Sequence, residues 1–469
     1  MSEKLDQPRN DLYDIGVTPQ LVLLAIVVIT ALAFDFTNGF HDTANAMATS
    51  IATKALTPKA AVSLCAALNL VGAFLSVEVA ITVTNAVIRI QDANGAPKPE
   101  LLADGGFPLL LILISGLAGA IIWNILTWLW GLPSSSSHAL FGGLVGSTVM
   151  SLGWSGVKWI GEGNHLDGIV GKVVLPALFS PVIACLVAAI GTRLVYRITE
   201  KVAARYLDVG FRRAQVGTAA LLSLSHGTND AQKTMGVITL ALVATQHWNL
   251  DDGIPFWVKV ACAFTIALGT FIGGWRIIRT MGKGLVEISP PQGFTADSSS
   301  AAVILISSQL GFALSTTHVA TGSILGTGLG RKGASVRWSV AGRMGIAWLI
   351  TLPLSGMVGA ICWILGHWVG LWAGQTVGAF AVTLVLVLAA GYMYMHSRRN
   401  AVGHHNIHDD WDSPASVGDS AQIGVAAAEV VEDFDHIGRP ASEAITPTDD
   451  IGHPAAEILG DSGESGGDT

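Results

Sequence analysis

Eight stretches of this chain are apolar for long enough to cross a lipid bilayer as helices, and this feature limits the fold more than any other. They lie near residues 20–46, 60–88, 107–131, 170–196, 215–247, 256–278, 338–367 and 372–396. A bilayer core needs about 20 predominantly apolar residues per helix. Only 13% of the 469 residues are charged, against roughly 25% in an ordinary soluble domain. The sequence therefore predicts an all-α polytopic membrane protein and argues against a cytosolic enzyme, a nucleic-acid-binding protein or a secreted disulfide scaffold.

Charge divides the chain into a basic body and an acidic tail. Residues 400–469 carry 15 Asp and Glu against one Arg, and their Gly-, Ser- and Pro-rich composition predicts disorder. The first span follows no basic segment and no cleavage site, so we expect an uncleaved helix. The expected organisation is an extracytoplasmic N-terminal segment (1–17), a first membrane repeat (18–198), a basic cytoplasmic loop (199–214), a second repeat with C-terminal helices (215–398) and an acidic disordered cytoplasmic tail (399–469).

The positions of Lys and Arg predict the orientation in the membrane, because bases are retained on the cytoplasmic side. They gather in residues 193–213, 276–283, 331–337 and 398–399. The acidic loops at 91–106 and 251–252 then lie outside, which puts the N-terminus outside the cell membrane and the tail in the cytoplasm. The loops can lie on these sides only if residues 107–152 and 298–329 each enter the membrane and return to the same face. Both are therefore predicted to be Ser/Thr-rich hairpins, inserted from opposite sides.

Two polar motifs each occur twice. The sequence NGFHDTAN at 38–45 aligns without gaps with HGTNDAQK at 226–233, so that a Gly and an Asp coincide. The sequence PSSSSH at 133–138 matches LSTTH at 314–318. The same order, similar spacing and opposite predicted orientation indicate an inverted-topology repeat.

The residue types in these motifs suit a site for an anion with co-transported cations. Asp42 and Asp230 are functional candidates, because a carboxylate at the middle of a membrane is costly unless it is paired or solvated. Gly39 and Gly227 are expected to break their helices and free backbone carbonyls for a cation. The Ser/Thr clusters open helical segments, whose N–H groups and positive dipole end favour a phosphate-like anion.

Simpler structural roles compete with these assignments. A Ser/Thr run often only caps a helix, and Gly142 with Gly146 is typical of a helix-packing face. Lys233 is expected mainly to neutralise the neighbouring acids. Glu78 has no counterpart in the other repeat, and its role stays open. The four cysteines are expected to be reduced packing residues (Cys65, Cys185, Cys262 and Cys362).

With these motifs the chain resembles the inorganic phosphate transporter (PiT) family over about residues 18–398. The resemblance implies import of orthophosphate through the cytoplasmic membrane, driven by protons or sodium. It implies that hydroxyl and amide groups surround the phosphate (Ser135, Ser136, Ser137, Ser315, Thr316, Thr317, Asn45 and Gln232). It also implies that a second group serves the coupling cation or proton (Asp42, Asp230, His41, Asn38 and Asn229).

His41 departs from the pattern of many sodium-coupled members, which carry Asn before the first Asp, as this chain does at Asn229. The form with His is similar to the bacterial low-affinity branch, which moves phosphate with protons, partly as a complex with a divalent metal. Imidazole titrates near physiological pH, so His41 could carry a coupling proton. The alternative is a neutral hydrogen-bond partner in place of Asn.

The expected function is therefore secondary active import of inorganic phosphate by symport with protons. Sodium coupling and another tetrahedral oxyanion, such as sulfate, are the alternatives. An intramembrane protease is a distant one, because Ser155 of a GWSG sequence lies in a polar loop and no GxGD motif occurs. No cofactor, no protein-bound metal and no nucleic acid is expected. The oligomeric state stays open, a homodimer included.

Overall fold

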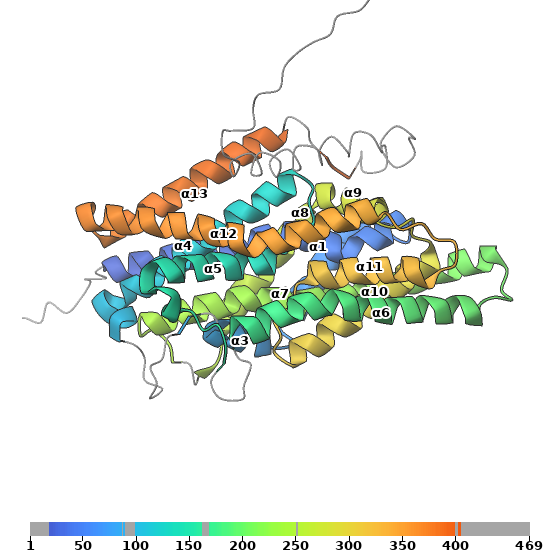
Figure 1. Cartoon of the computed structure of the whole chain (residues 1–469), viewed down its shortest axis with the longest axis horizontal. Coiled ribbons are helices and arrows are strands. Elements are labelled where there is room, and N and C mark those ends of the chain that lie inside the picture. The colour runs from blue at the N-terminus through green and yellow to red at the C-terminus, as the bar shows by residue number, and fades with distance from the viewer. Residues whose placement is uncertain are drawn as a thin grey trace, which may run out of the picture. The chain divides into compact units, whose positions relative to one another are not determined.

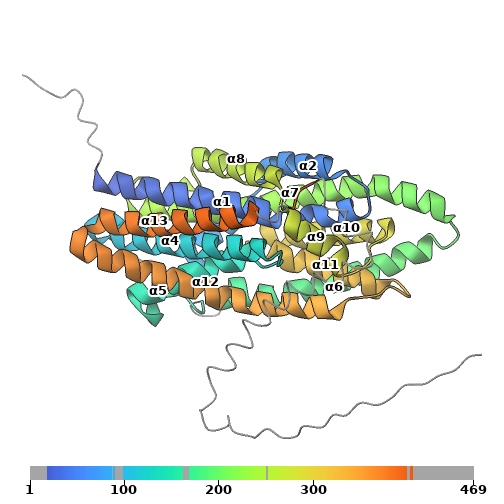
Figure 2. The same cartoon turned by 90° about the horizontal axis from the view of Figure 1, so that it is seen from above.

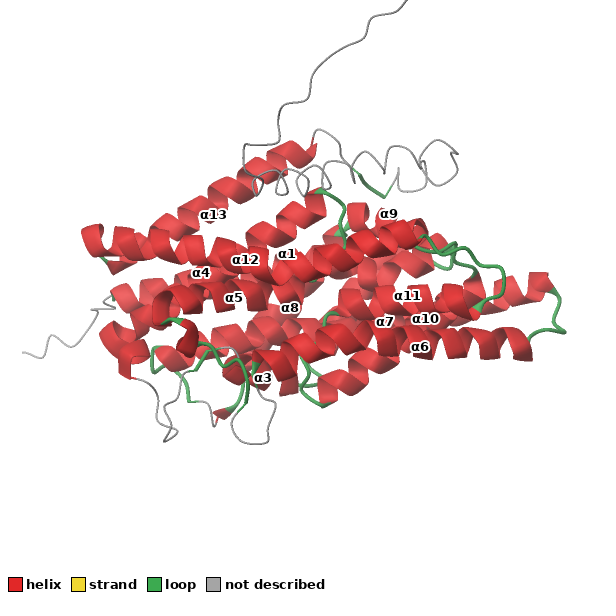
Figure 3. Cartoon of the chain, viewed as in Figure 1, coloured by secondary structure: helices red, strands yellow, loops and turns green. Residues whose placement is uncertain are grey.

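A computed structural model describes residues 18–86, 88–89, 99–161, 168–249, 252–398 and 402–404 of the chain. The chain divides into two compact units, 1–413 and 414–469, and the second lies outside the described residues. So do most of the predicted acidic tail, the N-terminal segment 1–17 and residues 91–98 of the acidic loop. The described residues form helices, with isolated bridges at Ile88–Val157 and Val286–Val336 and no longer strand (Figure 3). The all-α prediction is confirmed.

The α-helices follow one another along the whole described chain. They are α1 (Pro19–Ala52), α2 (Pro58–Gly72), α3 (Glu78–Ala86), α4 (Pro99–Leu129), α5 (Ser136–Leu152), α6 (Leu175–Ile198), α7 (Ala204–Ala244), α8 (Phe256–Ile272), α9 (Trp275–Gly284), α10 (Pro290–Gln309), α11 (Thr316–Gly330), α12 (Trp338–Ala373) and α13 (Gln375–Ser397). A short π-helical turn, Val170–Val174, precedes α6.

Five helices of the described chain are long and apolar enough to cross a membrane. They are α1, α4 from Ala103 onward, α6 with the turn before it, α12 and α13. A sixth span results if α8 and α9, which meet at a bend of 67°, count as one. The chain is therefore a multi-pass membrane protein, as predicted.

Three of the eight predicted spans differ from the structure, and one of them is 256–278, which is divided between α8 and α9 at the 67° bend. The stretch 60–88 is interrupted, because α2 ends at Gly72 and α3 starts at Glu78. Gly72 packs so closely on α7 that a Cβ there would lie 2.2 Å from the carbonyl oxygen of Leu224. Most of the stretch 215–247 belongs to the 41-residue helix α7, which ends at Ala244. This helix is not among the apolar candidates because the polar motif 226–233 lies in it.

The prediction that helices break at Gly39 and Gly227 is wrong. Both α1 and α7 continue through their motifs without interruption. The two glycines instead allow close helix packing: an added Cβ would lie 2.4 Å from the carbonyl oxygen of Ile266 at the first position and 2.3 Å from that of Asn69 at the second. Breaks occur elsewhere, at residues 103–106 inside α4 and between α8 and α9.

The two Ser/Thr-rich segments form hairpins, α4 with α5 and α10 with α11. From the middle of the described helices, α5 extends toward one end and α11 toward the other (Figures 1 and 2). Each shorter helix packs on a long helix from the other half of the chain, α5 on α12 and α11 on α6. Gly142 and Gly146 of α5, and Gly322 and Gly326 of α11, lie against backbone carbonyls of these partners. The packing role predicted for Gly142 and Gly146 is therefore observed.

Candidate functional site

The starts of α5 and α11 have the same local structure. The Oγ of Ser135 accepts a hydrogen bond from the backbone N–H of His138 at 3.1 Å, and the Oγ of Ser315 accepts one from the N–H of His318 at 3.3 Å. Both serines are thus N-caps, which satisfy one exposed donor of the first turn. Ser135 and Ser315, predicted to bind phosphate, are used here in capping.

A reciprocal pair of hydrogen bonds joins the two helix starts. The hydroxyl of Ser137 donates to the carbonyl of Leu314 at 3.3 Å, and the hydroxyl of Thr317 donates to the carbonyl of Ser134 at 3.0 Å. In the alignment of the two motifs, Ser137 corresponds to Thr317 and Ser134 to Leu314. Each Ser/Thr motif therefore binds the other through equivalent atoms, which is the contact pattern of a local pseudo-two-fold axis. The positive ends of both helices meet there.

Asp42 of α1 lies at this junction, buried. Its Oδ1 lies 2.7 Å from Nδ1 of His41, and its Oδ2 accepts a hydrogen bond from the Ser136 hydroxyl at 2.5 Å. The other ring nitrogen of His41 lies 3.1 Å from Oγ1 of Thr127 in α4. The hydroxyl of Ser134 donates to the same Oγ1 at 2.8 Å, so the hairpin α4–α5 surrounds the imidazole.

Asp230 of α7 repeats the arrangement from the other side. Its Oδ1 accepts a hydrogen bond from Nδ2 of Asn229 at 2.9 Å, and its Oδ2 accepts one from the Thr316 hydroxyl at 3.0 Å. The residue before each aspartate and the first residue of each short helix thus make equivalent contacts. The structure brings together two carboxylates and two hydroxyl-bearing helix starts, as the motifs indicated.

Lys233 makes more contacts in this cluster than its predicted role, neutralising the neighbouring acids, requires. Its Nζ forms an ion pair with Asp230 and donates to the Ser137 hydroxyl at 2.6 Å and to the Leu314 carbonyl at 3.0 Å. In the motif alignment it corresponds to Asn45, whose Nδ2 donates to the hydroxyls of Thr316 and Thr317. The sequence signal for this role is a lone Lys in a mid-membrane motif, three residues after an Asp.

His226 also belongs to the cluster, although it was not among the predicted site residues. Its Nε2 lies 2.9 Å from Oδ2 of Asp230, one helical turn away. Its Nδ1 lies 3.3 Å from Oδ1 of Asn69, whose Nδ2 donates to Oγ1 of Thr270 at 2.8 Å. His226 therefore connects Asp230 with Asn69 of α2.

Two predicted residues are placed differently from expectation. Gln232 does not join the cluster: its Oε1 accepts from the backbone N–H groups of Val79 and Ala80, so it caps α3. Asn38, one turn before Asp42 on α1, is buried, and its side-chain amide has no hydrogen-bond partner. Glu78, whose role was open, is exposed at the first residue of α3.

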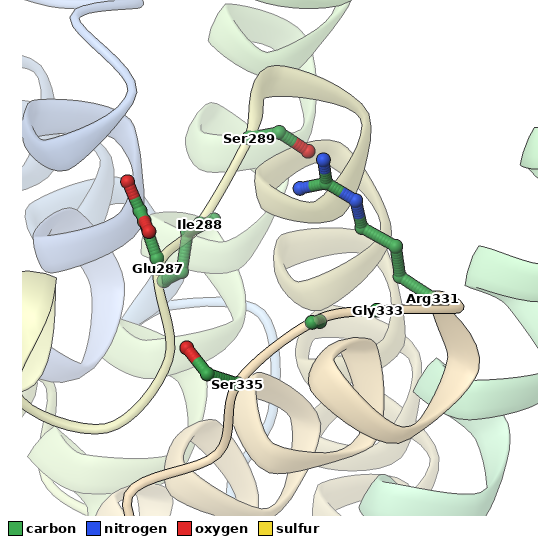
Figure 4. A pocket seen from close by; sticks show the side chains of 7 residues that line it. Glu287, Ile288, Ser289, Arg331, Gly333 and Ser335 are labelled. Carbon is green, nitrogen blue, oxygen red and sulfur yellow. The ribbon is translucent and has the colours of Figure 1, made fainter.

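The cluster is closed to solvent. The side chains that build it, from His41 to Thr317, all belong to residues at most 5% exposed. A cavity of about 320 Å³ lies elsewhere, beside the loops after α9 and α11, and Glu287, Ser289 and Arg331 are among its lining residues (Figure 4). No residue of the cluster lines that cavity. Phosphate would therefore need a conformational change to reach the junction.

One group of side chains in the cluster has the geometry of a metal site. A carboxylate oxygen of Asp42, a carboxylate oxygen of Asp230 and a ring nitrogen of His226 lie within 4.8 Å of one another. Carboxylates and imidazole are ligands for divalent transition metals and zinc. Two carboxylates in a buried space also need positive charge nearby, and Lys233 supplies it to one of them.

Comparison with known proteins agrees with this geometry. A model of the "Phosphate transporter family" matches residues 38–359. A probable low-affinity inorganic phosphate transporter of Mycobacterium bovis is 54% identical over 400 residues, which covers 85% of this chain and 90% of that protein. A probable low-affinity inorganic phosphate transporter of Bacillus subtilis is 42% identical over 346 residues, covering 74% of this chain and 97% of that protein.

A solved structure described as the sodium-dependent phosphate transporter has the same fold. It matches with a TM-score of 0.61 at 22% identity, over 74% of this chain and 99% of that one. The matched region of the family model includes both copies of both polar motifs. The chain therefore belongs to the phosphate transporter family and is a multi-pass membrane transporter, not an enzyme.

Proposed function

We propose that this protein imports inorganic phosphate across the cell membrane by symport with protons, and that the cluster around Asp42 and Asp230 binds the phosphate. The observation that supports it most is the convergence of two carboxylates with the first hydroxyls of α5 and α11. The hydroxyls of Ser136, Ser137, Thr316 and Thr317 would turn from their present acceptors to the phosphate oxygens. The backbone N–H groups of both helix starts would face the same anion.

Negative charge makes a coupling cation necessary. Phosphate enters as an anion beside two buried carboxyl groups, and three negative charges cannot occupy a buried space without compensation. Protons are available to this cluster through two imidazoles, His41 beside Asp42 and His226 beside Asp230. We therefore assign proton coupling to this cluster, with Asn38 and Asn229 as neighbouring polar groups.

A neutral complex of phosphate with a divalent metal is the second candidate substrate. It is favoured by the grouping of Asp42, Asp230 and His226 within 4.8 Å, which offers two oxygens and one nitrogen to a single ion. The metal would be cargo and would leave with the phosphate. Its own charge would then compensate the two carboxylates during transport.

Uptake of radiolabelled phosphate into proteoliposomes tests the proposal. A proton gradient, a sodium gradient and a divalent metal are supplied separately and then together. We expect accumulation with the proton gradient alone. Accumulation that requires sodium would replace proton coupling by sodium coupling, and labelled metal that enters in a fixed ratio to phosphate would identify the complex as the substrate. If sulfate inhibits phosphate uptake as strongly as arsenate does, the site is not specific for phosphate.

A further inference from the structure

We propose that the ammonium group of Lys233 is a built-in cation that replaces one coupling cation, so that this transporter needs a mobile cation only beside Asp42. The inference rests on the proposed function, phosphate transport, and specifies its ion requirement. Lys233 is fully buried, and among the described side chains it is the only Lys or Arg that is buried.

The surroundings of Nζ are those of a bound cation. An ammonium group has three N–H donors, and here three oxygens surround it: a carboxylate oxygen of Asp230, the Ser137 hydroxyl and the Leu314 carbonyl. Carboxylate, hydroxyl and carbonyl oxygens are the ligands that small hard cations select. Because all three N–H groups are in use, Lys233 is not a free donor for phosphate in this conformation.

The equivalent position in the first repeat has no fixed charge. Asn45, which aligns with Lys233, donates its neutral amide to the hydroxyls of Thr316 and Thr317 at 3.1 and 3.0 Å. Asp42 is paired instead with the imidazole of His41, and no buried Lys or Arg of the described residues lies beside it. One carboxylate thus has an ammonium group of the protein as its counter-charge, and the other does not.

This asymmetry separates the roles of the two repeats. The second repeat compensates Asp230 with Lys233 in every step of the cycle, independent of the ions in solution. The first repeat exchanges its cation with solution, so it carries the coupling. If Lys233 and Asp230 formed only a structural ion pair, the result would differ. Loss of the pair would lower the stability of the protein but would not create a new ion requirement.

The test is the ion requirement of the full-length Lys233→Asn variant, which gives the second repeat the side chain of the first. Initial phosphate uptake is measured in proteoliposomes with external sodium or with choline, at two pH values. Binding of radioactive Na⁺ is measured on the purified protein. The exposed Lys201, changed to Asn, is the matched control.

For the wild type and Lys201→Asn we expect equal uptake in sodium and choline and no sodium binding. In Lys233→Asn, uptake without sodium should fall at least about tenfold, because Asp230 loses its buried counter-charge. Sodium should restore uptake and bind to the variant. Recovery by acid alone would show a proton in the same role and also supports the inference.

Three results would overturn the inference. They are binding of more than one sodium ion per wild-type protein, wild-type uptake by Lys233→Asn in choline, and a folded variant that gains neither sodium nor acid dependence. If Lys233→Asn does not fold, Lys233→Gln and the wild-type sodium-binding measurement decide in its place. A wild type that moves no phosphate under any gradient would instead reject the proposed function.

Discussion

Asp42 and Asp230 face the same hydroxyl group, that of Thr316, whose Oγ1 lies 3.4 Å from Oδ2 of the first and 3.0 Å from Oδ2 of the second. The three residues come from α1, α7 and α11. A hydroxyl has one proton and can donate to only one carboxylate at a time. Thr316 therefore connects the two aspartates, and a change at either aspartate should alter the hydrogen bond that Thr316 makes with the other.

The first prediction concerns the two carboxylates. Asp42→Asn and Asp230→Asn should each abolish concentrative phosphate uptake, because each removes a buried charge that the site compensates in the bound state. Uptake of labelled phosphate into proteoliposomes is the measurement. Either variant that still accumulates phosphate at a near-normal rate would exclude that residue from the mechanism.

The second prediction is that these two variants differ in stability. Asp230→Asn leaves the buried ammonium of Lys233 without its counter-charge, a loss of about 3–5 kcal/mol. Asp42→Asn leaves only His41, which can stay neutral, so its loss should be smaller. Thermal unfolding of the purified variants measures the difference. The double variant Asp230→Asn/Lys233→Met should recover stability but not uptake. Equal unfolding temperatures for the two single variants would contradict the assigned pairing.

Much of this site can be predicted from the sequence because both polar motifs occur twice. Asp42 and Asp230 align with each other, as do the two Ser/Thr runs, and polar residues in apolar stretches are costly enough to imply contact. The all-α class follows from the apolar stretches alone. The hairpins follow from the distribution of Lys and Arg, since the predicted membrane crossings do not otherwise close.

Other features depend on contacts between distant segments, which one sequence does not reveal. Gly39 and Gly227 look like helix breakers, but facing carbonyl oxygens in α8 and α2 make them packing positions. Gln232 looks like a ligand, but the N–H groups at the start of α3 take its oxygen. Lys233 looks like one neutralising charge, and only the structure shows it joining α7 to both helix starts.

The third prediction tests the packing role of the motif glycines. Gly227→Ala should destabilise the protein, because the new Cβ would lie 2.3 Å from the carbonyl oxygen of Asn69. Gly217→Ala is the matched control in the same helix, since nothing lies within 4 Å of a Cβ there. The control should gain up to about 1 kcal/mol from helix propensity. Comparable unfolding temperatures for both variants would show that the contact with α2 is not close.

The fourth prediction concerns the orientation of the two hairpins. Single cysteines replacing Ala103, at the start of the first hairpin, and Lys332, just after the second, should react with an impermeant maleimide from outside and from inside, respectively. Both positions are exposed. Three of the four native cysteines are buried. Labelling of both new cysteines from one side would contradict the inverted repeat.

The last prediction separates proton coupling from simple hydrogen bonding at His41. Its Nδ1 lies 2.7 Å from Asp42 Oδ1, and Asn229 makes the same contact with Asp230 through an amide at 2.9 Å. His41→Asn therefore keeps the hydrogen bond and removes only the titratable group. If the ring carries a coupling proton, its protonation changes during each cycle, and wild-type uptake should vary with pH.

We expect His41→Asn to retain phosphate binding while its uptake loses most of this pH dependence. Initial rates from about pH 5.5 to about pH 8.5 in sodium-free vesicles give the comparison, a range that spans the titration of imidazole. A residual dependence that disappears only when His226 is also changed to Asn would place a second exchangeable proton between His226 and Asp230, whose atoms lie 2.9 Å apart, and would contradict a mobile cation beside Asp42 alone. Superimposable profiles of wild type and His41→Asn would instead make His41 a spacer, and the coupling proton would then have to be carried by an aspartate or by the phosphate itself.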